Sequence, residues 1–227
     1  LAFTGLTKME QIEIAGTVTS IGTGAFKSCS KLTSFPIPEN LNSTCDDSFV
    51  LMTSLTSFVV PETNKFYKAK DGVLFNFAGN ELIQYPIGKT ETEYSIAETV
   101  TKIAKNAFKY SKLQSIQIPN SVTEILSYAF AECTELTQIT LPENLLTISD
   151  YLLFDCTSLK TLKLSSKLEI IGKSSFSMCK SLTSLELPGS IQSIGQNAFF
   201  SNINLAYLKF NGKQDPTHGS LVFGNCP

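Results

Sequence analysis

The chain has 227 residues, of which 42% are hydrophobic, and its formal charge is −2. This length supports a substantial core in one or two domains, and the near-neutral charge gives no sign of a nucleic-acid partner or an anionic membrane. No apolar stretch reaches the roughly 18 residues of a membrane-spanning helix, and a single histidine leaves little material for metal or Cys–His chemistry.

The first part of the chain repeats with a period of 23 residues, the spacing of Phe3, Phe26 and Phe49. The consensus, in this part and later, is A-F-x-x-C-x-x-L-x-x-I-x-I/L-P-x-x-V/I-x-x-I-G. L-x-x-I-x-I predicts a short strand that proline ends, and V-x-x-I predicts a second extended or turn segment. A-F-x-x-C predicts one helical turn with Phe pointing inward. Stacked copies would share a continuous core, with their strands in parallel.

An insertion interrupts the repeats in the middle of the chain, where Phe49 and Phe108 are 59 residues apart. "DGVLFNF", "AGN" and "ELIQYP" predict a strand, a tight turn at Gly79 and a strand, and so a β-hairpin insertion at about 62–94. Its aromatic side chains exceed what a two-stranded ribbon can bury. Either alternate members pack on the repeats, or they form an exposed patch for docking or dimerisation. These residues are Phe66, Tyr67, Phe75, Phe77 and Tyr85.

The repeats resume at Ile96 and continue through anchors at Phe108, Phe130, Leu153, Phe176, Phe199 and Phe223. In the last unit, polar turn residues replace V-x-x-I within 211–223, which predicts a loop. Both chain ends share one repeat phase and lack a polar cap. We therefore interpret residues 1–227 as a single domain that is a fragment of a longer array.

The repeat resembles the 23-residue leucine-rich repeat of the Treponema pallidum type, also called BspA-like, over essentially the whole chain. The resemblance implies an α/β repeat: a horseshoe-shaped solenoid with a parallel β-sheet on the concave side and single helical or 3-10 turns on the convex side. It also implies a cell-surface or secreted protein linked to adhesion to host cells, matrix or other microbes. It implies no catalytic residues and no cofactor.

Strand residues that point away from the core are the candidate ligand contacts of such a solenoid. The first column consists of Gln11, Ser34, Ser57, Ser115, Gln138, Thr161, Ser184 and Tyr207. The second consists of Glu13, Pro36, Val59, Gln117, Thr140, Lys163, Glu186 and Lys209. One interpretation is a solvated sheet face, on which Lys163, Glu186 and Lys209 pair across neighbouring strands. The other is an extended face that binds a protein or glycan through many weak contacts, with Tyr207 as its aromatic anchor.

Cys133, Cys156 and Cys179 occupy one column, three residues after the anchor, and Cys29 and Cys226 share that position. Other repeats place Leu6, Met52 or Asn202 there. A metal site would not tolerate these replacements, whereas a small packing position would. We therefore expect the three central cysteines to be buried, reduced thiols. Cys45 lies outside the column and is the thiol expected to be accessible.

The remaining candidate sites are weak. Asn42 begins an N-x-S/T glycosylation sequon. Asp46, Asp47 and Asp71 are isolated carboxylates near turns, and His218 lies in a predicted turn without a partner. No nucleotide, hydrolase or metalloprotease motif is present, so we expect no enzymatic activity.

Two functions remain open. The first is adhesion to a protein or glycan on another cell or on matrix. The second is a structural spacer or a self-associating surface coat with no dedicated ligand. In either case the sequence predicts no membrane insertion by this segment and a location at the cell surface or outside the cell.

Overall fold

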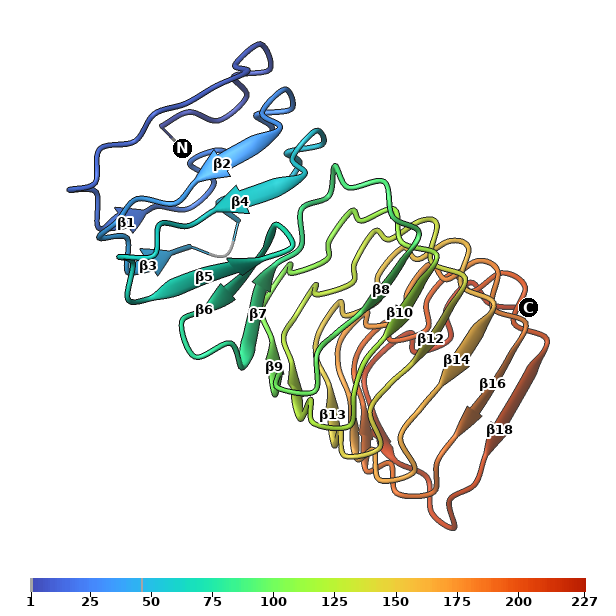
Figure 1. Cartoon of the computed structure of the whole chain (residues 1–227). Coiled ribbons are helices and arrows are strands. Elements are labelled where there is room, and N and C mark those ends of the chain that lie inside the picture. Colours follow the sequence, from blue (N-terminus) through green and yellow to red (C-terminus); the bar gives the residue numbers. More distant parts are fainter. Residues whose placement is uncertain (1, 46) are drawn as a thin grey trace.

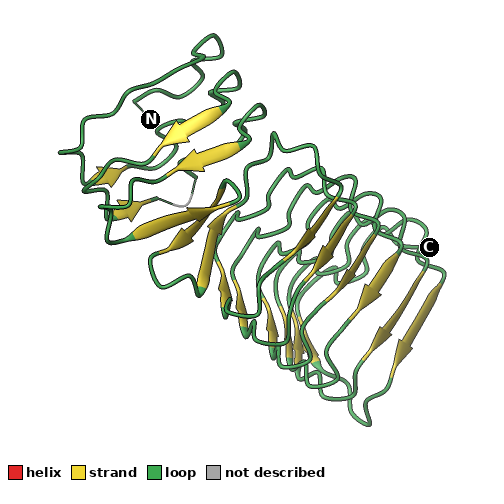
Figure 2. Cartoon of the chain, viewed as in Figure 1, coloured by secondary structure: helices red, strands yellow, loops and turns green. Residues whose placement is uncertain are grey.

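The computed structural model describes residues 2–45 and 47–227, and within these ranges every regular element is a β-strand. Figures 1 and 2 show short strands joined by turns and loops in successive windings of the chain. The strands are β1 (Ser20–Ile21), β2 (Ser34–Pro36), β3 (Ser43–Thr44), β4 (Ser57–Val59), β5 (Tyr67–Lys70), β6 (Val73–Asn76), β7 (Glu81–Gln84), β8 (Glu93–Ser95), β9 (Lys102–Ile103), β10 (Ser115–Gln117), β11 (Glu124–Ile125), β12 (Gln138–Thr140), β13 (Thr147–Ile148), β14 (Thr161–Lys163), β15 (Ile170–Ile171), β16 (Ser184–Leu187), β17 (Ser193–Ile194), β18 (Tyr207–Phe210) and β19 (Thr217–His218).

The L-x-x-I-x-I segments form what we call the front sheet. It comprises the parallel groups β2–β4, β8–β10–β12–β14 and β16–β18. Pairing advances by one repeat at a time, so that Ser115 lies opposite Gln138 and Gln138 opposite Thr161. The central strand residues, such as Ile139 and Leu185, point into the core. The predicted parallel strands are therefore confirmed. In Figure 1, the front strands β8, β10, β12, β14, β16 and β18 form a row across the C-terminal part.

The V-x-x-I segments form a second sheet, with the parallel groups β1–β3, β7–β9–β11 and β13–β15–β17–β19. The prediction of a loop throughout 211–223 is wrong, because Thr217–His218 form β19. Thr217 N donates to Gln192 O, and Gly219 N donates to Ile194 O, both at 2.9 Å. These bonds use only backbone groups, so polar side chains do not prevent the pairing.

The predicted helical turns are wrong: the A-F-x-x-C segments form a ladder of turns that we call the turn face. Around most anchors, the residues two before and two after have left-handed backbones, as Ser174 (φ 50°) and Met178 (φ 66°) do around Phe176. Such residues interrupt a right-handed helix. The amides bond to the next repeat instead, from Phe176 N to Ala198 O and from Met178 N to Phe200 O, both at 2.8 Å.

The insertion is the meander β5–β6–β7 rather than a single hairpin. Gly79 makes the predicted turn between β6 and β7, with a φ of 79°. A second turn at Asp71 and Gly72, with φ values of 51° and 78°, joins β5 to β6. Asp-Gly is typical of two-residue hairpin turns, so the sequence contained this signal. β7 then continues the second sheet by pairing Leu82 with Ile103 of β9.

The described apolar interior forms two clusters that meet at the meander. Leu74 packs in the cluster of the N-terminal region (residues 2–60), whereas Val73 and Phe75 pack in the cluster of the C-terminal region (residues 96–223). The Asp71–Gly72 turn also contacts β4, where Phe58 N donates to Gly72 O at 2.9 Å. The meander therefore joins the two regions through both sheet pairing and core packing. The single-domain assignment over 1–227 and the concave placement of the front sheet stay predictions.

Candidate functional site

The candidate binding face is the outward surface of β10, β12, β14, β16 and β18. Nine of the ten predicted contact residues of these strands are exposed, because strand side chains alternate between core and solvent, and the tenth, Ser115, is partly buried. The nine are Gln117, Gln138, Thr140, Thr161, Lys163, Ser184, Glu186, Tyr207 and Lys209. Register confirms the two columns within each strand group, with Thr140 opposite Lys163 and Glu186 opposite Lys209. Their role in binding stays a prediction.

The expected chain of ion pairs on this face forms only in part. Lys209 Nζ lies 3.6 Å from Glu186 Oε2 on the neighbouring strand. Lys163, by contrast, pairs with Glu143 Oε1 at 3.6 Å, and β14 and β16 belong to different groups of the sheet. Both pairs are well exposed, so each contributes little to stability.

The N-terminal members of the two columns lie apart from this face. Ser34, Pro36, Ser57 and Val59 lie on β2 and β4, and Gln11 and Glu13 lie outside the strands. The columns also missed Glu93 and Ser95, which are exposed on β8 and pair with Ser115 and Gln117. These two residues precede their partners on β10 by 22 residues, close to the repeat period, and this spacing could have identified them.

The cysteine column forms a ladder of hydrogen bonds between repeats. Cys133 Sγ donates to Phe108 O at 3.1 Å and Cys179 Sγ to Leu153 O at 3.3 Å, and Asn202 Nδ2 makes the equivalent bond to Phe176 O. Burial raises the pKa of Cys133 to about 11 and that of Cys179 to about 12. The predicted burial of the three central cysteines is confirmed, and Cys45 is exposed as predicted, whereas the redox state of the thiols stays a prediction.

The meander aromatics divide between the core and the solvent. Tyr67, Phe75 and Tyr85 are buried, whereas Phe66 and Phe77 are about half exposed. Phe77 N donates to Phe66 O at 2.7 Å, so the two exposed rings come from directly paired backbone positions. Packing back on the repeats is therefore confirmed for the inward members, and docking by the outward pair stays a prediction.

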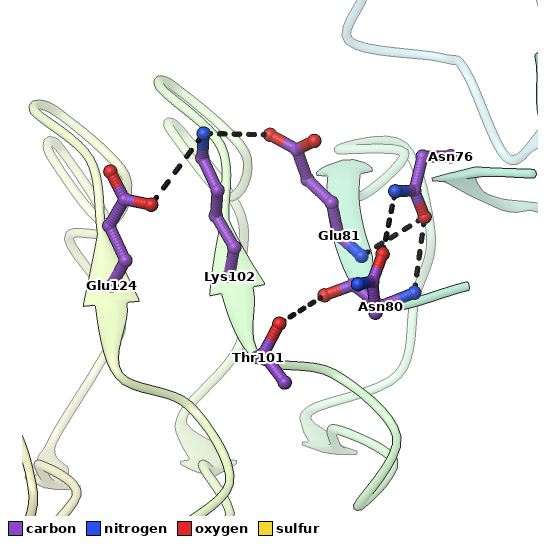
Figure 3. Close-up of polar contacts among 6 residues, drawn as sticks. All are labelled: Asn76, Asn80, Glu81, Thr101, Lys102 and Glu124. Atoms are coloured by element: carbon purple, nitrogen blue, oxygen red, sulfur yellow. Dashed lines mark hydrogen bonds and ion pairs between the residues drawn. The ribbon is translucent and has the colours of Figure 1, made fainter. Parts of the chain in front are cut away.

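Beside the meander, a row of charges crosses the second sheet (Figure 3). Lys102 Nζ lies 3.5 Å from Glu81 Oε1 and 3.6 Å from Glu124 Oε2, on the two flanking strands. Asn76 Oδ1 accepts bonds from the backbone amides of Gly79, Asn80 and Glu81. Asn80 O in turn accepts a bond from Thr101 Oγ1 at 3.3 Å. The residues that close the β6–β7 turn thus also fasten it to the following repeat.

An aromatic stack on the turn face was not predicted. The rings of Tyr128 and Tyr151 lie 4.6 Å apart between centroids and are nearly parallel, at 4°. Lys109 Nζ lies 5.0 Å from the centroid of Tyr128, and Lys173 Nζ lies 5.9 Å from that of Tyr151. Both tyrosines stand two residues before an anchor, so their 23-residue spacing was the available signal. The lysines already cover outer ring faces, an arrangement that favours a stabilising role.

The isolated candidates lie at separate positions in the structure. Asn42 is exposed just before β3, so its sequon is accessible, and glycosylation stays a prediction. His218 is exposed on β19 rather than in a turn, and Asp47 accepts a bond from Asn106 Nδ2 at 2.7 Å. Asp46 lies outside the described residues.

Within residues 2–45 and 47–227, no three His, Cys, Asp or Glu side chains gather closely enough to hold a metal ion. The same ranges contain no helix with the length and apolar character that crossing a membrane requires.

Solved structures of bacterial leucine-rich-repeat proteins are similar to this chain. One from Eubacterium ventriosum is 27% identical, with a TM-score of 0.76, and the match covers 96% of this chain and 64% of that one. A leucine-rich cell surface protein from Faecalibacterium prausnitzii is 22% identical, with a TM-score of 0.58, over 88% of this chain and 53% of that one. The leucine-rich-repeat protein of T. pallidum is 21% identical, with a TM-score of 0.57, over 74% of this chain and 90% of that one. The last two show the fold alone.

The chain thus spans less than two thirds of the first two of these proteins. No curated protein matches it in a sequence comparison. A family model described as the BspA type leucine rich repeat region matches residues 1–85 and 101–227, in six copies. Together with the parallel sheets and the 23-residue pairing offset, this match shows that the chain belongs to the BspA-type leucine-rich-repeat family.

Proposed function

We propose that this chain is a non-enzymatic adhesion module at the cell surface or outside the cell. It recognises a protein or glycan on another cell, on matrix or on a microbe. The recognition surface is the outward face of β10, β12, β14, β16 and β18. One observation carries the proposal: on that face, five of the nine polar side chains make no side-chain hydrogen bond or ion pair within residues 2–45 and 47–227. They are Gln138, Thr140, Thr161, Ser184 and Tyr207.

These side chains offer both donors and acceptors, and successive strands of a sheet lie about 4.8 Å apart. A ligand that spans several strands can therefore form many weak bonds at once. Tyr207 is 52% exposed and provides a ring with a hydroxyl group, a combination that is frequent at the centres of interfaces. Family membership supports a binding role, and a surface location is in keeping with the name of the F. prausnitzii relative.

The alternative is a structural spacer or a self-associating coat without a dedicated ligand. Phe66 and Phe77 favour self-association, because their rings are about half exposed on the meander at directly paired backbone positions. This alternative predicts no saturable binding to cells or matrix.

The experiment compares binding of the fluorescently labelled chain to host cells and to matrix-coated plates. A Lys163→Glu/Lys209→Glu variant changes the charge of the front sheet, and a Lys31→Glu/Lys213→Glu variant makes the same change at exposed residues elsewhere. We expect saturable binding that the first variant weakens at least fivefold and the second leaves within twofold. Binding that never saturates, or that both variants weaken equally, would favour the spacer.

A further inference from the structure

The front sheet is interrupted between β14 and β16, whereas the second sheet is continuous through the same repeats. Among the strands of the described residues, β14 pairs with β12 alone and β16 with β18 alone. Behind them, β15 and β17 remain paired, with Ile170 opposite Ser193. The two repeats are therefore held together at the back while their front strands each present an unpaired edge.

The backbone bonds of neighbouring repeats locate the interruption. Thr137 N donates to Gln114 O, Lys160 N to Thr137 O and Ala206 N to Thr183 O, at 2.9–3.0 Å. Among residues 2–45 and 47–227, the bond expected between these, from Thr183 N to Lys160 O, does not form.

Hydroxyl bonds bracket this opening on both sides. Ser181 Oγ donates to Thr157 O at 2.7 Å before the strands, and Ser190 Oγ donates to Ser166 O at 3.0 Å after them. The opening is thus confined to the length of one strand.

A groove of about 430 Å³ lies at this seam, lined by residues of both strands. Its apolar lining includes Leu162 and Leu164, which are only partly buried. The corresponding residues of the preceding repeat, Ile139 and Leu141, are fully buried. The opening therefore exposes core side chains that an intact ladder covers.

The β14 side of the groove is basic. Lys160 and Lys163 line it, and the Lys163 side chain is 67% exposed. Lys163 also pairs with Glu143, and on the opposite side Glu186 pairs with Lys209; both ion pairs are exposed, at distances of 3.6 Å. A ligand with a negative charge next to an apolar group therefore complements the two lysines and the leucines below them.

We infer that this seam accepts an extended peptide segment of a partner protein, with an apolar side chain over Leu162 and an acidic side chain toward Lys160 and Lys163. Unpaired backbone groups on a strand edge match the spacing of an extended peptide, which a glycan does not reproduce. The inference rests on the proposed adhesive function and names the ligand class: a protein, bound by strand addition.

A disulfide across the seam tests the inference. In a Cys45→Ala background, the Thr161→Cys/Ser184→Cys variant would join β14 to β16 at equivalent positions. A disulfide needs a Cα separation of roughly 4.4–6.8 Å, so its formation would draw the two unpaired strands together and close the opening. The matched control, Gln138→Cys/Thr161→Cys, joins β12 to β14, which are already paired. The probe is a fluorescein-labelled hexapeptide of alternating valine and glutamate. Its binding is measured by fluorescence anisotropy.

We expect the oxidised seam variant to bind the probe at least tenfold more weakly than its reduced form, and the control to bind equally in both states. A peptide of alternating valine and lysine should bind at least tenfold more weakly than the glutamate peptide to the unmodified chain. Equal affinity of the oxidised and reduced seam variants would overturn the inference, as would a lack of saturable probe binding to the unmodified chain.

The cell-binding assay separates this failure from that of the proposed function. If the oxidised seam variant keeps saturable, charge-sensitive binding to cells, the seam is not the ligand site and front-sheet adhesion stands. If the unmodified chain does not bind cells or matrix at all, the adhesive function fails, and the inference with it.

Discussion

The N-terminal and C-terminal regions share the same repeat but pack their aromatic anchor residues differently. In the C-terminal region, anchor rings stack almost in parallel: Phe176 and Phe199 lie 5.3 Å apart at 9°. In the N-terminal region, Phe35 lies edge-on between Phe26 and Phe49, at 4.8 and 5.0 Å and about 70°.

The difference follows from one position, the centre of the front strand. Phe35 and Phe58 occupy it in the N-terminal region, whereas Ile139 and Leu185 occupy it in the C-terminal region. Phe35 meets the anchors Phe26 and Phe49 edge-on, whereas Phe176 and Phe199 stack, as Phe3 and Phe26 do where Ile12 is the central residue. The 23-residue period survives both arrangements, so the period does not determine how a core is packed.

The largest expected effect comes from removing a central ring in either region. Phe176→Ala and Phe35→Ala should each cost about 3–5 kcal/mol of unfolding free energy, because both side chains are fully buried. Since the regions have separate clusters, Phe35→Ala should also split the urea transition, measured by circular dichroism, into two. A single transition at the parent's midpoint for both variants would contradict this packing.

The joint between the regions should be sensitive at Gly72. A Cβ there would lie 2.8 Å from Thr56 O, and the φ of 78° is costly for any other residue. Gly72→Ala should cost about 2–4 kcal/mol in the same urea measurement. Gly79→Ala is the matched control: its φ is 79°, but the Cβ would meet the flexible end of Lys68, so about 1–2 kcal/mol is expected. Equal losses would show that the Gly72 contact with β4 is unimportant.

Alkaline pH should destabilise the C-terminal region through its buried thiols. Folding raises the pKa of Cys133 from 9.0 to about 11, so the thiol binds a proton more tightly in the folded state. The contribution of the protonated Cys133 thiol to the unfolding free energy is complete below pH 9. It is lost as the pH rises from 9 toward 11, and the loss amounts to roughly 2–3 kcal/mol. Urea titrations across this range should show the decline. Cys133→Ser/Cys179→Ser should reduce this decline without abolishing it, because Cys156 keeps a raised pKa, and an unchanged slope in that variant would assign the effect to other groups.

The smallest expected effect concerns the tyrosine stack of the C-terminal region; in the N-terminal region, Gly24 occupies the position equivalent to Tyr128. Tyr128→Leu removes a contact with Tyr151 and another with Lys109. Thermal unfolding should report a loss of about 0.5–1.5 kcal/mol. Tyr128→Phe keeps the ring and should stay within about 0.5 kcal/mol of the parent. A loss of equal size in both variants would point to the hydroxyl group instead.

Periodicity predicted the features that every repeat shares. Inward strand residues such as Ile139, the buried cysteine column and the outward columns follow directly from spacing, because each repeat meets the same neighbours. The turn face did not follow: the anchors indicated a helix, and nothing in A-F-x-x-C reveals that Met178 takes a left-handed backbone. That conformation depends on bonds to the next repeat, which a local pattern does not contain.

Irregular features were predicted less well. β19 was not predicted from its polar residues, because its pairing uses backbone groups alone. The turn at Gly79 was predicted, whereas the turn at Asp71 and Gly72 was not. The partner of Lys163 was also missed, since a column of charges does not disclose where the sheet is interrupted. The candidate seam is such an interruption, so its residues were identified on the outward face but its opening was not.

The hydrogen-bond offset between repeats has a consequence for how such chains change in length. The thiols of Cys133, Cys156 and Cys179 donate to the carbonyl oxygens of Phe108, Phe130 and Leu153, respectively. Donor and acceptor are thus separated by a nearly constant number of residues in each repeat. Duplication or deletion of one whole repeat by unequal recombination would leave every remaining bond with an equivalent partner. The reach of the front sheet can therefore be adjusted in steps of about 4.8 Å without redesign of the core.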